Sequence, residues 1–277
     1  MSALSRMRLL LLGTLVPLLI VVGVLVGATL GGSGDDAVER DAFAAATPSR
    51  GYTPAGSERI DVGRGARGVA IFRRRGGGAS TGGPVVLFLH GWTAVDPRAY
   101  GAWIGHLARK GATVIYPTYQ AAPFLDTVSP LANTLAAVAT AVRIVDVAPD
   151  RLIVAGHSAG GALAADYAAS APAAGVPVPA AVFSVYPGRS LAGIPLAIPA
   201  VSARNIRPGT RVLALAGERD RLVGARVARQ IARTAIRARV TLRIVRDNAV
   251  DRHAAPARSD AAARRAFWAP LDRLIAR

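Results

Sequence analysis

Two segments of the chain have a serine flanked two positions away by glycines, the Gly-x-Ser-x-Gly pattern of many nucleophilic serines. One is centred on Ser80 and the other on Ser158. The serine is reactive only where a strand ends in a sharp turn into a helix, because that turn lifts the hydroxyl above the sheet. An apolar run over residues 151–155 precedes the second segment, and helix-forming residues come after it, whereas the first lies in a glycine-rich loop. We therefore predict that Ser158 is the nucleophile and Ser80 a loop residue.

A serine hydroxyl is a weak nucleophile and needs an imidazole base within hydrogen-bond reach. The chain has four histidines. His157 adjoins Ser158, and neighbours in such a turn point apart, so a structural role is expected. His106 lies inside a predicted helix, and His90 ends a predicted strand. His253 comes after the last predicted strand, on a loop, and we predict that it is the base.

The acid that orients the base is expected between nucleophile and base, since the order Ser, acid, His belongs to the nucleophile-elbow arrangement. The segment after the apolar run at 211–216 offers two carboxylates, Glu218 and Asp220. Asp220 is preferred because Glu218 is too close to the end of the strand, and Asp220 is expected to begin a helix. Asp247 and Asp251 are expected to be solvated loop residues or turn caps.

The negative charge that develops on the substrate needs backbone N–H donors, an oxyanion hole. The residue after the nucleophile, Ala159, supplies one donor. The loop after the run at 84–89 supplies the other, and Trp92 is the candidate. Its indole is also expected to line the acyl or leaving-group pocket; the alternative is an ordinary aromatic residue at the rim, and the two roles are compatible.

Apolar runs alternate with helix-like segments along the remainder of the chain, which predicts a mostly parallel sheet with right-handed crossovers and helices on both faces. The carboxyl ends of such strands form the functional edge. Strands are predicted over 58–63, 68–73, 84–89, 112–117, 151–155, 180–186, 211–216 and 240–246, and helices over 97–110, 129–145, 158–171, 222–236 and 260–276.

The N-terminus has the character of a membrane-directed segment. Arg6 and Arg8 precede an uncharged apolar stretch at residues 9–30, and Asp35 and Asp36 come after it. This charge asymmetry predicts that the chain beyond the stretch lies outside the cytoplasm. The stretch exceeds the about 7–15 residues of a cleaved signal and reaches the about 20 of a spanning helix, which favours an anchor over a cleaved signal.

These features divide the chain into an anchor or signal (1–32), a linker rich in glycine, serine and proline (33–56) and a catalytic domain (57–277). The chain contains no cysteine, which excludes disulfides, cysteine nucleophiles and a lipoprotein anchor. A net charge of +17 with few aromatic residues favours cations spread over solvated faces rather than a nucleic-acid platform. The oligomeric state is left open.

Four motifs together resemble the α/β-hydrolase superfamily over nearly the whole chain after residue 57: HGWTA at 90–94, GHSAGG at 156–161, GERDRLV at 217–223 and DRHAAP at 251–256. Among its members, the chain is similar to lid-poor bacterial esterases, both the cutinase and polyester-hydrolase group and dienelactone-hydrolase-like proteins. It departs from the polyester hydrolases at Trp92 and Ala159 and lacks their terminal disulfide.

The resemblance implies an α/β-hydrolase fold with a minimal lid, because only about 25 residues separate the runs at 180–186 and 211–216. Leu191, Ile194, Leu196 and Ile198 are expected to form a small apolar rim. The implied reaction is cleavage of a carboxylic ester, such as a lipid or an ester presented at a surface, through an acyl-enzyme and without a cofactor. Acyl transfer or amide cleavage by the same residues is one alternative, and a non-catalytic cell-surface protein on this fold is another.

Overall fold

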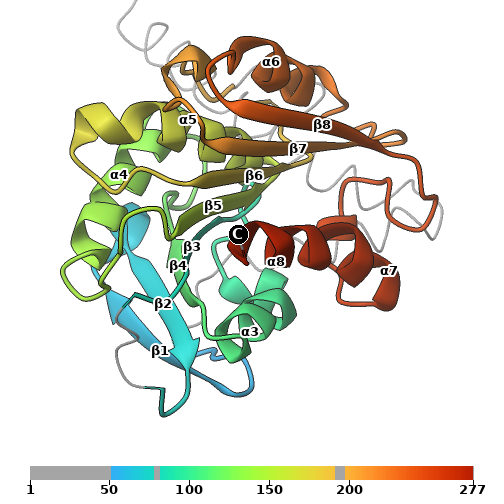
Figure 1. Cartoon of the computed structure of the whole chain (residues 1–277). Coiled ribbons are helices and arrows are strands. Elements are labelled where there is room, and N and C mark those ends of the chain that lie inside the picture. The colour runs from blue at the N-terminus through green and yellow to red at the C-terminus, as the bar shows by residue number, and fades with distance from the viewer. Residues whose placement is uncertain (1–50, 78–81, 191–196, 277) are drawn as a thin grey trace, which may run out of the picture. The chain divides into compact units, whose positions relative to one another are not determined.

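The architecture is an eight-stranded sheet between two layers of helices (Figure 1), seen in a computed structural model that describes residues 51–77, 82–190 and 197–276. The predicted anchor at 9–30, residues 33–50 of the predicted linker and Ser80 lie outside the described residues. The strands are β1 (Ser57–Val62), β2 (Val69–Arg74), β3 (Val85–Leu89), β4 (Thr113–Pro117), β5 (Leu152–His157), β6 (Ala181–Val185), β7 (Arg211–Gly217) and β8 (Arg239–Val245).

The strand order is β1-β2-β4-β3-β5-β6-β7-β8, and β2 alone runs in the direction opposite to the other strands. Strands β3 to β6 are short and entirely buried, as expected of strands covered on both faces. The predicted α/β-hydrolase fold with a mostly parallel sheet is therefore confirmed.

Helices α4, α5 and α6 pack beside one another on one face of the sheet, and α3 and α8 lie on the other (Figure 1). Helix α5 and the strands of the sheet supply most of the side chains of the main apolar cluster. The helices are α3 (Gly101–Arg109), α4 (Pro130–Ala141), α5 (Ala159–Ala174), α6 (Arg226–Thr234), α7 (Ala261–Ala263) and α8 (Ala269–Ile275), with a π-helical turn at Arg264–Trp268 and 3-10 turns at Gly65–Arg67, Pro97–Tyr100, Ala203–Asn205 and Ala255–Ala257.

The register of the parallel strands brings their carboxyl ends to one edge of the sheet. Leu89 of β3 pairs with Gly156 of β5, and Gly217 of β7 pairs with Val245 of β8. The loops after these four strands therefore begin side by side. They carry the four segments in which the site is predicted from the sequence.

Two local predictions were wrong. The helix predicted from residue 222 begins only at Arg226, and Asp220 does not begin it: the Asp220 side chain instead accepts bonds from two backbone amides just after it in the chain, and the chain turns until Gly224. Ile198, expected at an exposed rim, is 3% exposed and belongs to the core.

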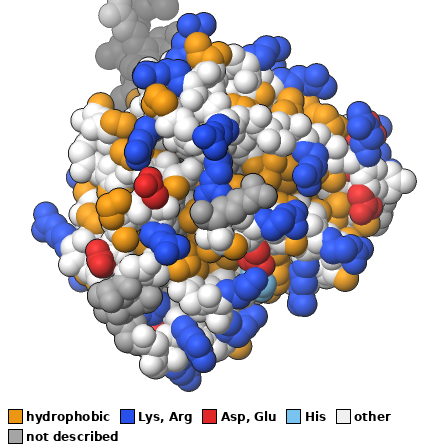
Figure 2. All heavy atoms as spheres, in the orientation of Figure 1, with side chains coloured by type: hydrophobic (Ala, Val, Ile, Leu, Met, Phe, Trp, Pro, Cys, Tyr) orange, Lys and Arg blue, Asp and Glu red, His pale blue; other side chains and the backbone are white. Residues whose placement is uncertain are grey.

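Of the predicted lid region, residues 186–190 and 197–210 are described, and their one regular element is the 3-10 turn Ala203–Asn205. Leu191, Ile194 and Leu196 lie outside the described residues. Among the described helices, none is both long and apolar enough to cross a bilayer. On the face drawn in Figure 2, lysine and arginine side chains are dispersed among apolar and uncharged atoms.

Candidate active site

Ser158 occupies the turn between β5 and α5, in a backbone conformation that L-residues rarely adopt. Its φ is 56° and its ψ is −122°. Strain of this kind persists only where the surroundings enforce it, and it concentrates at functional sites. A side-chain carbon at Gly156 would overlap the carbonyl of Gly160, and one at Gly160 would overlap the carbonyl of Leu89. The two glycines of the pentapeptide are therefore required by the close approach of backbone segments.

The structure brings together the three residues predicted from the sequence. Nε2 of His253 lies 2.9 Å from Oγ of Ser158, and Nδ1 of His253 lies 2.7 Å from Oδ2 of Asp220. All three residues are at most 5% exposed. Aspartate accepts only, so Nδ1–H of His253 donates to Asp220, and Nε2 is left to accept the Ser158 hydroxyl proton. This is the arrangement in which an imidazole serves as a general base.

Asp220 is fixed on both of its oxygens. Oδ2 accepts from His253, while Oδ1 accepts from the backbone N–H of Leu222 at 3.0 Å and of Val223 at 3.1 Å. The two amides prevent rotation of the carboxylate and compensate for the water it loses on burial. The turn that replaces the predicted start of the helix is thus the element that positions Asp220.

The competing carboxylates have other partners. Glu218 is exposed and pairs with Arg246 at 3.0 Å. Asp247 caps the turn after β8 by accepting from the amide of Ala249. Asp251, predicted to be solvated or a turn cap, is instead fully buried and bonds to Arg219. That prediction was wrong because Arg219, from the neighbouring loop, supplies a charge partner that local sequence does not reveal.

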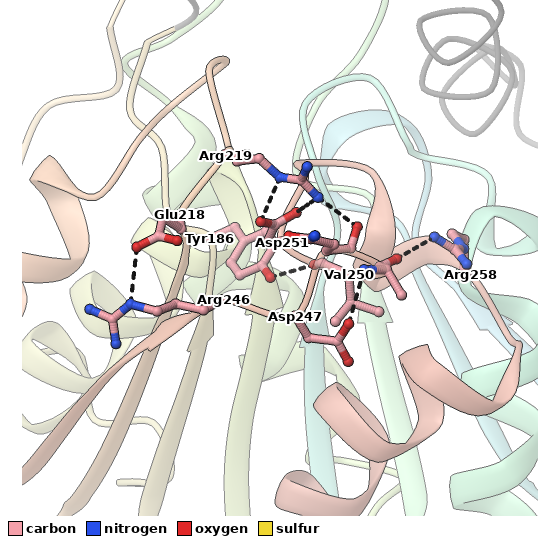
Figure 3. Close-up of polar contacts among 10 residues, drawn as sticks. Tyr186, Glu218, Arg219, Arg246, Asp247, Val250, Asp251 and Arg258 are labelled. Carbon is pink, nitrogen blue, oxygen red and sulfur yellow. Dashed lines mark hydrogen bonds and ion pairs between the residues drawn. The ribbon is translucent and has the colours of Figure 1, made fainter.

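Arg219 and Asp251 tie the loop that carries the acid to the loop that carries the base (Figure 3). Nε and Nη2 of Arg219 lie 2.8 and 3.0 Å from the two carboxylate oxygens, and Nη2 also donates to the carbonyl of Asn248. Arg219 directly precedes Asp220 in the chain, and Asp251 lies two residues before His253. The two-point geometry therefore restricts how far acid and base can move apart.

The loop of His253 is held at further points. The Tyr186 hydroxyl donates to the carbonyl of Val250 at 2.6 Å, and Arg258 donates to the carbonyl of Ala249 at 2.7 Å (Figure 3). These anchors come from the end of β6 and from the C-terminal segment. The backbone around the base is therefore held by tertiary contacts in addition to the local turn that Asp247 caps.

The loop after β3 and the start of α5 present the two predicted oxyanion donors, Trp92 and Ala159. Neither the Trp92 nor the Ala159 amide has a hydrogen-bond acceptor among the residues that the structure describes. The amide of Thr93, at a φ of 66°, donates to Oε1 of Gln120, and the Tyr119 hydroxyl donates to the carbonyl of His90. Side chains from the segment after β4 thus fix the loop, leaving two amides to receive an anion. The Trp92 indole is partly buried against the core.

His90 and His106, neither of them predicted to be the base, have partners elsewhere. The ring nitrogens of His90 lie 2.6 and 2.8 Å from the carbonyls of Gly91 and Thr118, and burial lowers the pKa of His90 to about 4. His106 bonds to Asp272. Across the described ranges, no cluster of three or more potential metal ligands occurs.

The sequence model of a family described as alpha/beta hydrolase fold matches residues 86–242, more than half of the chain. No curated protein sequence matches. A thermostable esterase from Pseudomonas putida ECU1011 is 21% identical, with a TM-score of 0.63 over 89% of this chain and 92% of that chain. A hormone-sensitive lipase from a metagenome library is 19% identical, with a TM-score of 0.64 over 94% and 97%.

A protein from Klebsiella pneumoniae subsp. pneumoniae MGH 78578, assigned as a dienelactone hydrolase, is 18% identical, with a TM-score of 0.57 over 79% of this chain and 99% of that chain. At such identities the similarity to solved structures establishes the fold. The matched sequence family, the strand order and the Ser158 turn agree with one another. The chain belongs to the alpha/beta hydrolase fold family.

Proposed function

We propose that the protein hydrolyses carboxylic esters, with Ser158 as nucleophile, His253 as base and Asp220 as orienting acid. The observation that carries the proposal is the unbroken line of hydrogen bonds from Asp220 through His253 to Ser158 at the carboxyl edge of the sheet. The names of structurally similar proteins, an esterase and a hormone-sensitive lipase, favour an ester over other acyl substrates.

In the acylation half, Nε2 of His253 takes the Ser158 proton while Oγ attacks the ester carbonyl carbon. The carbonyl oxygen becomes an oxyanion, which the N–H groups of Trp92 and Ala159 are placed to receive. Asp220 holds Nδ1–H and stabilises the imidazolium. When the intermediate collapses, the carbon–oxygen bond to the alcohol breaks, and the alcohol leaves with the proton from His253.

In the deacylation half, water replaces the alcohol. Nε2 of His253 takes a proton from water, whose oxygen attacks the acyl carbon, and the bond to Ser158 Oγ then breaks with return of the proton to that oxygen. The net reaction consumes one ester and one water and releases one acid and one alcohol. Nothing in either half requires a metal or an organic cofactor.

A chain-length series of p-nitrophenyl esters tests this proposal. Replacing Ser158 by alanine is expected to lower kcat by a factor on the order of 10³ or more, because the nucleophile is gone while the fold remains. Ser80→Ala, at the serine of the other matching pentapeptide, is the control and is expected to retain full activity. Wild-type protein that hydrolyses no ester in the series contradicts the proposal, and faster cleavage of matched p-nitroanilides assigns amide hydrolysis instead.

We also propose that the catalytic domain lies outside the cytoplasm, attached through residues 9–30 or released after cleavage. The support is the charge asymmetry around that apolar stretch. Fractionation of cells that express the full chain, with N-terminal sequencing of the product, tests it. Full-length protein free in the cytoplasm contradicts the proposal, and a mature N-terminus between about residues 28 and 50 selects the cleaved form.

A further inference from the structure

A buried tyrosine and a buried histidine connect the three loops of the site. The amide of Gly91 donates to the hydroxyl of Tyr100 at 3.1 Å, and this hydroxyl lies 2.8 Å from Nδ1 of His157. Nε2 of His157 lies 2.9 Å from the carbonyl oxygen of His253. Tyr100 is 1% exposed and His157 is fully buried. We call this series of contacts the Tyr100–His157 bridge.

Each contact in the bridge has a defined proton. A carbonyl oxygen only accepts, so Nε2 of His157 carries a proton and donates it to His253. Burial, together with the neighbouring His253, lowers the pKa of His157 well below 6.5, so its ring is neutral near pH 7 and Nδ1 is unprotonated. Burial raises the pKa of Tyr100, which therefore keeps its proton and donates it to Nδ1. The hydrogen bonds thus run in one direction, from Gly91 to His253.

Three residues of the bridge adjoin or belong to groups with a proposed catalytic role. Gly91 precedes Trp92, whose amide is a proposed oxyanion donor; His157 precedes Ser158; and the final acceptor is the backbone of His253 itself. We propose that Tyr100 and His157 are positioning residues that hold the oxyanion loop, the nucleophile and the base in one geometry. This inference rests on the proposed ester hydrolysis.

The bridge also controls charge beside the base. The rings of His157 and His253 have centroids 4.9 Å apart. During acylation His253 becomes an imidazolium, and a second positive charge at this distance in a buried site would oppose its formation. The unprotonated Nδ1 that accepts from Tyr100 and the N–H that donates to a carbonyl are the contacts of the neutral ring. The bridge therefore favours the form of His157 that leaves the positive charge to His253.

Kinetics with a matched control separate positioning from packing. Tyr167 is also fully buried and donates its hydroxyl to a backbone carbonyl, that of Pro177 at 2.8 Å, at the far end of α5. Tyr100→Phe removes the two hydrogen bonds of the Tyr100 hydroxyl, from Gly91 and to His157, and Tyr167→Phe removes the one from Tyr167 to Pro177. Both are expected to lower the melting temperature. Only Tyr100→Phe is expected to lower kcat for p-nitrophenyl butyrate, by about 10- to 100-fold with KM changed less than about threefold.

Non-additivity provides a second kinetic criterion. If Tyr100 acts through His157, the Tyr100→Phe/His157→Phe double variant is no slower than His157→Phe alone. The His157→Phe substitution already removes the contact through which Tyr100 acts, so the second substitution has nothing further to remove. Tyr100→Phe with the wild-type kcat, or a double variant in which the two losses multiply, contradicts the bridge. Where His157→Phe does not fold, the comparison of Tyr100→Phe with Tyr167→Phe decides.

Nitrogen NMR tests the bridge without relying on activity. Labelling with ¹⁵N-histidine gives signals from only four imidazoles. His157 is expected to remain neutral with the proton on Nε2 from about pH 5 to pH 9, and Tyr100→Phe is expected to shift its Nδ1 signal. A His157 that titrates near its ordinary pKa, or that carries its proton on Nδ1, overturns the bridge. An inactive wild-type protein with the expected spectra instead overturns the ester hydrolysis and leaves the bridge standing.

Discussion

The two edges of the sheet bury different kinds of polar side chain. At the carboxyl edge, where β3, β5, β7 and β8 end, buried polar residues include ionisable and amide groups: His90, Gln120, His157, Ser158, Asp220, Asp251 and His253. At the amino edge, within the described part of the chain, the buried polar residues are the hydroxyl-bearing Ser57, Thr113 and Thr210. The Arg207–Asp150 pair near that edge remains in contact with water, since its side chains are 56% and 69% exposed.

Burying an ionisable group costs several kcal/mol unless hydrogen bonds and charge partners compensate. Stability alone therefore gives no reason to gather histidines and aspartates at one edge. The contrast indicates that the carboxyl edge is organised for chemistry, while at the amino edge the parallel strands only begin. Substitutions at both edges and a change of pH test this contrast, and the largest effect is expected at Asp220.

Asp220→Asn is expected to lower kcat for ester hydrolysis by a factor on the order of 10³–10⁴, because an amide no longer holds the proton on Nδ1 of His253. Glu218→Gln is the matched control two residues away, with an exposed side chain, and kcat is expected to be unchanged. Steady-state kinetics of both variants provide the measurement. Equal losses in the two would assign the orienting role to the segment rather than to Asp220.

Acid is expected to destabilise the fold through the carboxyl edge. Unfolded His90 binds a proton below about pH 6.5, whereas burial lowers the folded pKa to about 4. Between these values the unfolded state binds more protons, so the free energy of unfolding falls as the pH falls. The His90 contribution to this loss is roughly 3 kcal/mol by pH 4. His157 acts in the same direction.

Melting temperatures measured between pH 7.5 and 4.5 test this prediction. Burial raises the pKa of Asp166, so that carboxyl acts in the opposite direction, and the comparison is therefore made between wild type and His90→Gln. The variant is expected to lose less stability over this range than wild type does. Parallel curves would show that His90 is not the titrating group.

Arg219→Gln is expected to lower the melting temperature, because it leaves the carboxylate of the fully buried Asp251 without its charged partner. It is also expected to reduce kcat, since the acid and base loops lose their cross-link. Arg246→Gln is the control: Arg246 pairs with the exposed Glu218 between the same two strand ends (Figure 3). If both variants melt at the same temperature, the Arg219–Asp251 pair does not constrain the loops.

Arg207→Ala at the amino edge is expected to have the smallest effect. Its contact to Asp150 is 3.4 Å long between well-exposed side chains. Such pairs contribute about 0–1 kcal/mol to the free energy of unfolding. Denaturant unfolding and ester kinetics are expected to match wild type within error. A marked loss of activity would show that the two edges are not as independent as the contrast implies.

Features that depend on neighbours along the chain were predictable from sequence. The strand before Ser158, the helix after it and the order Ser158, Asp220, His253 can be inferred from apolar runs and motif spacing. The turn at Asp220 was not predicted, because the periodicity of apolar residues does not show whether a carboxylate caps a turn before a helix begins.

Features that depend on pairs of loops were also not predictable. Arg219 and Asp251 are 32 residues apart, and Tyr100 and His157 are 57 apart. Nothing in their local sequence marks them as partners, although each of Arg219, Asp251 and His157 lies within two residues of a predicted catalytic residue. Charged or aromatic neighbours of a predicted catalytic residue are therefore the signal that could have drawn attention to them.

Covalent labelling shows whether Ser158 is an activated nucleophile, on which the proposed chemistry depends. Purified protein is treated with a fluorophosphonate, and the modified peptide is identified by mass spectrometry. We expect one adduct per chain, on Ser158, and no adduct in Ser158→Ala although that variant keeps the wild-type melting temperature. Labelling that persists in Ser158→Ala, or a wild-type protein that takes up no label, would contradict the assignment of Ser158.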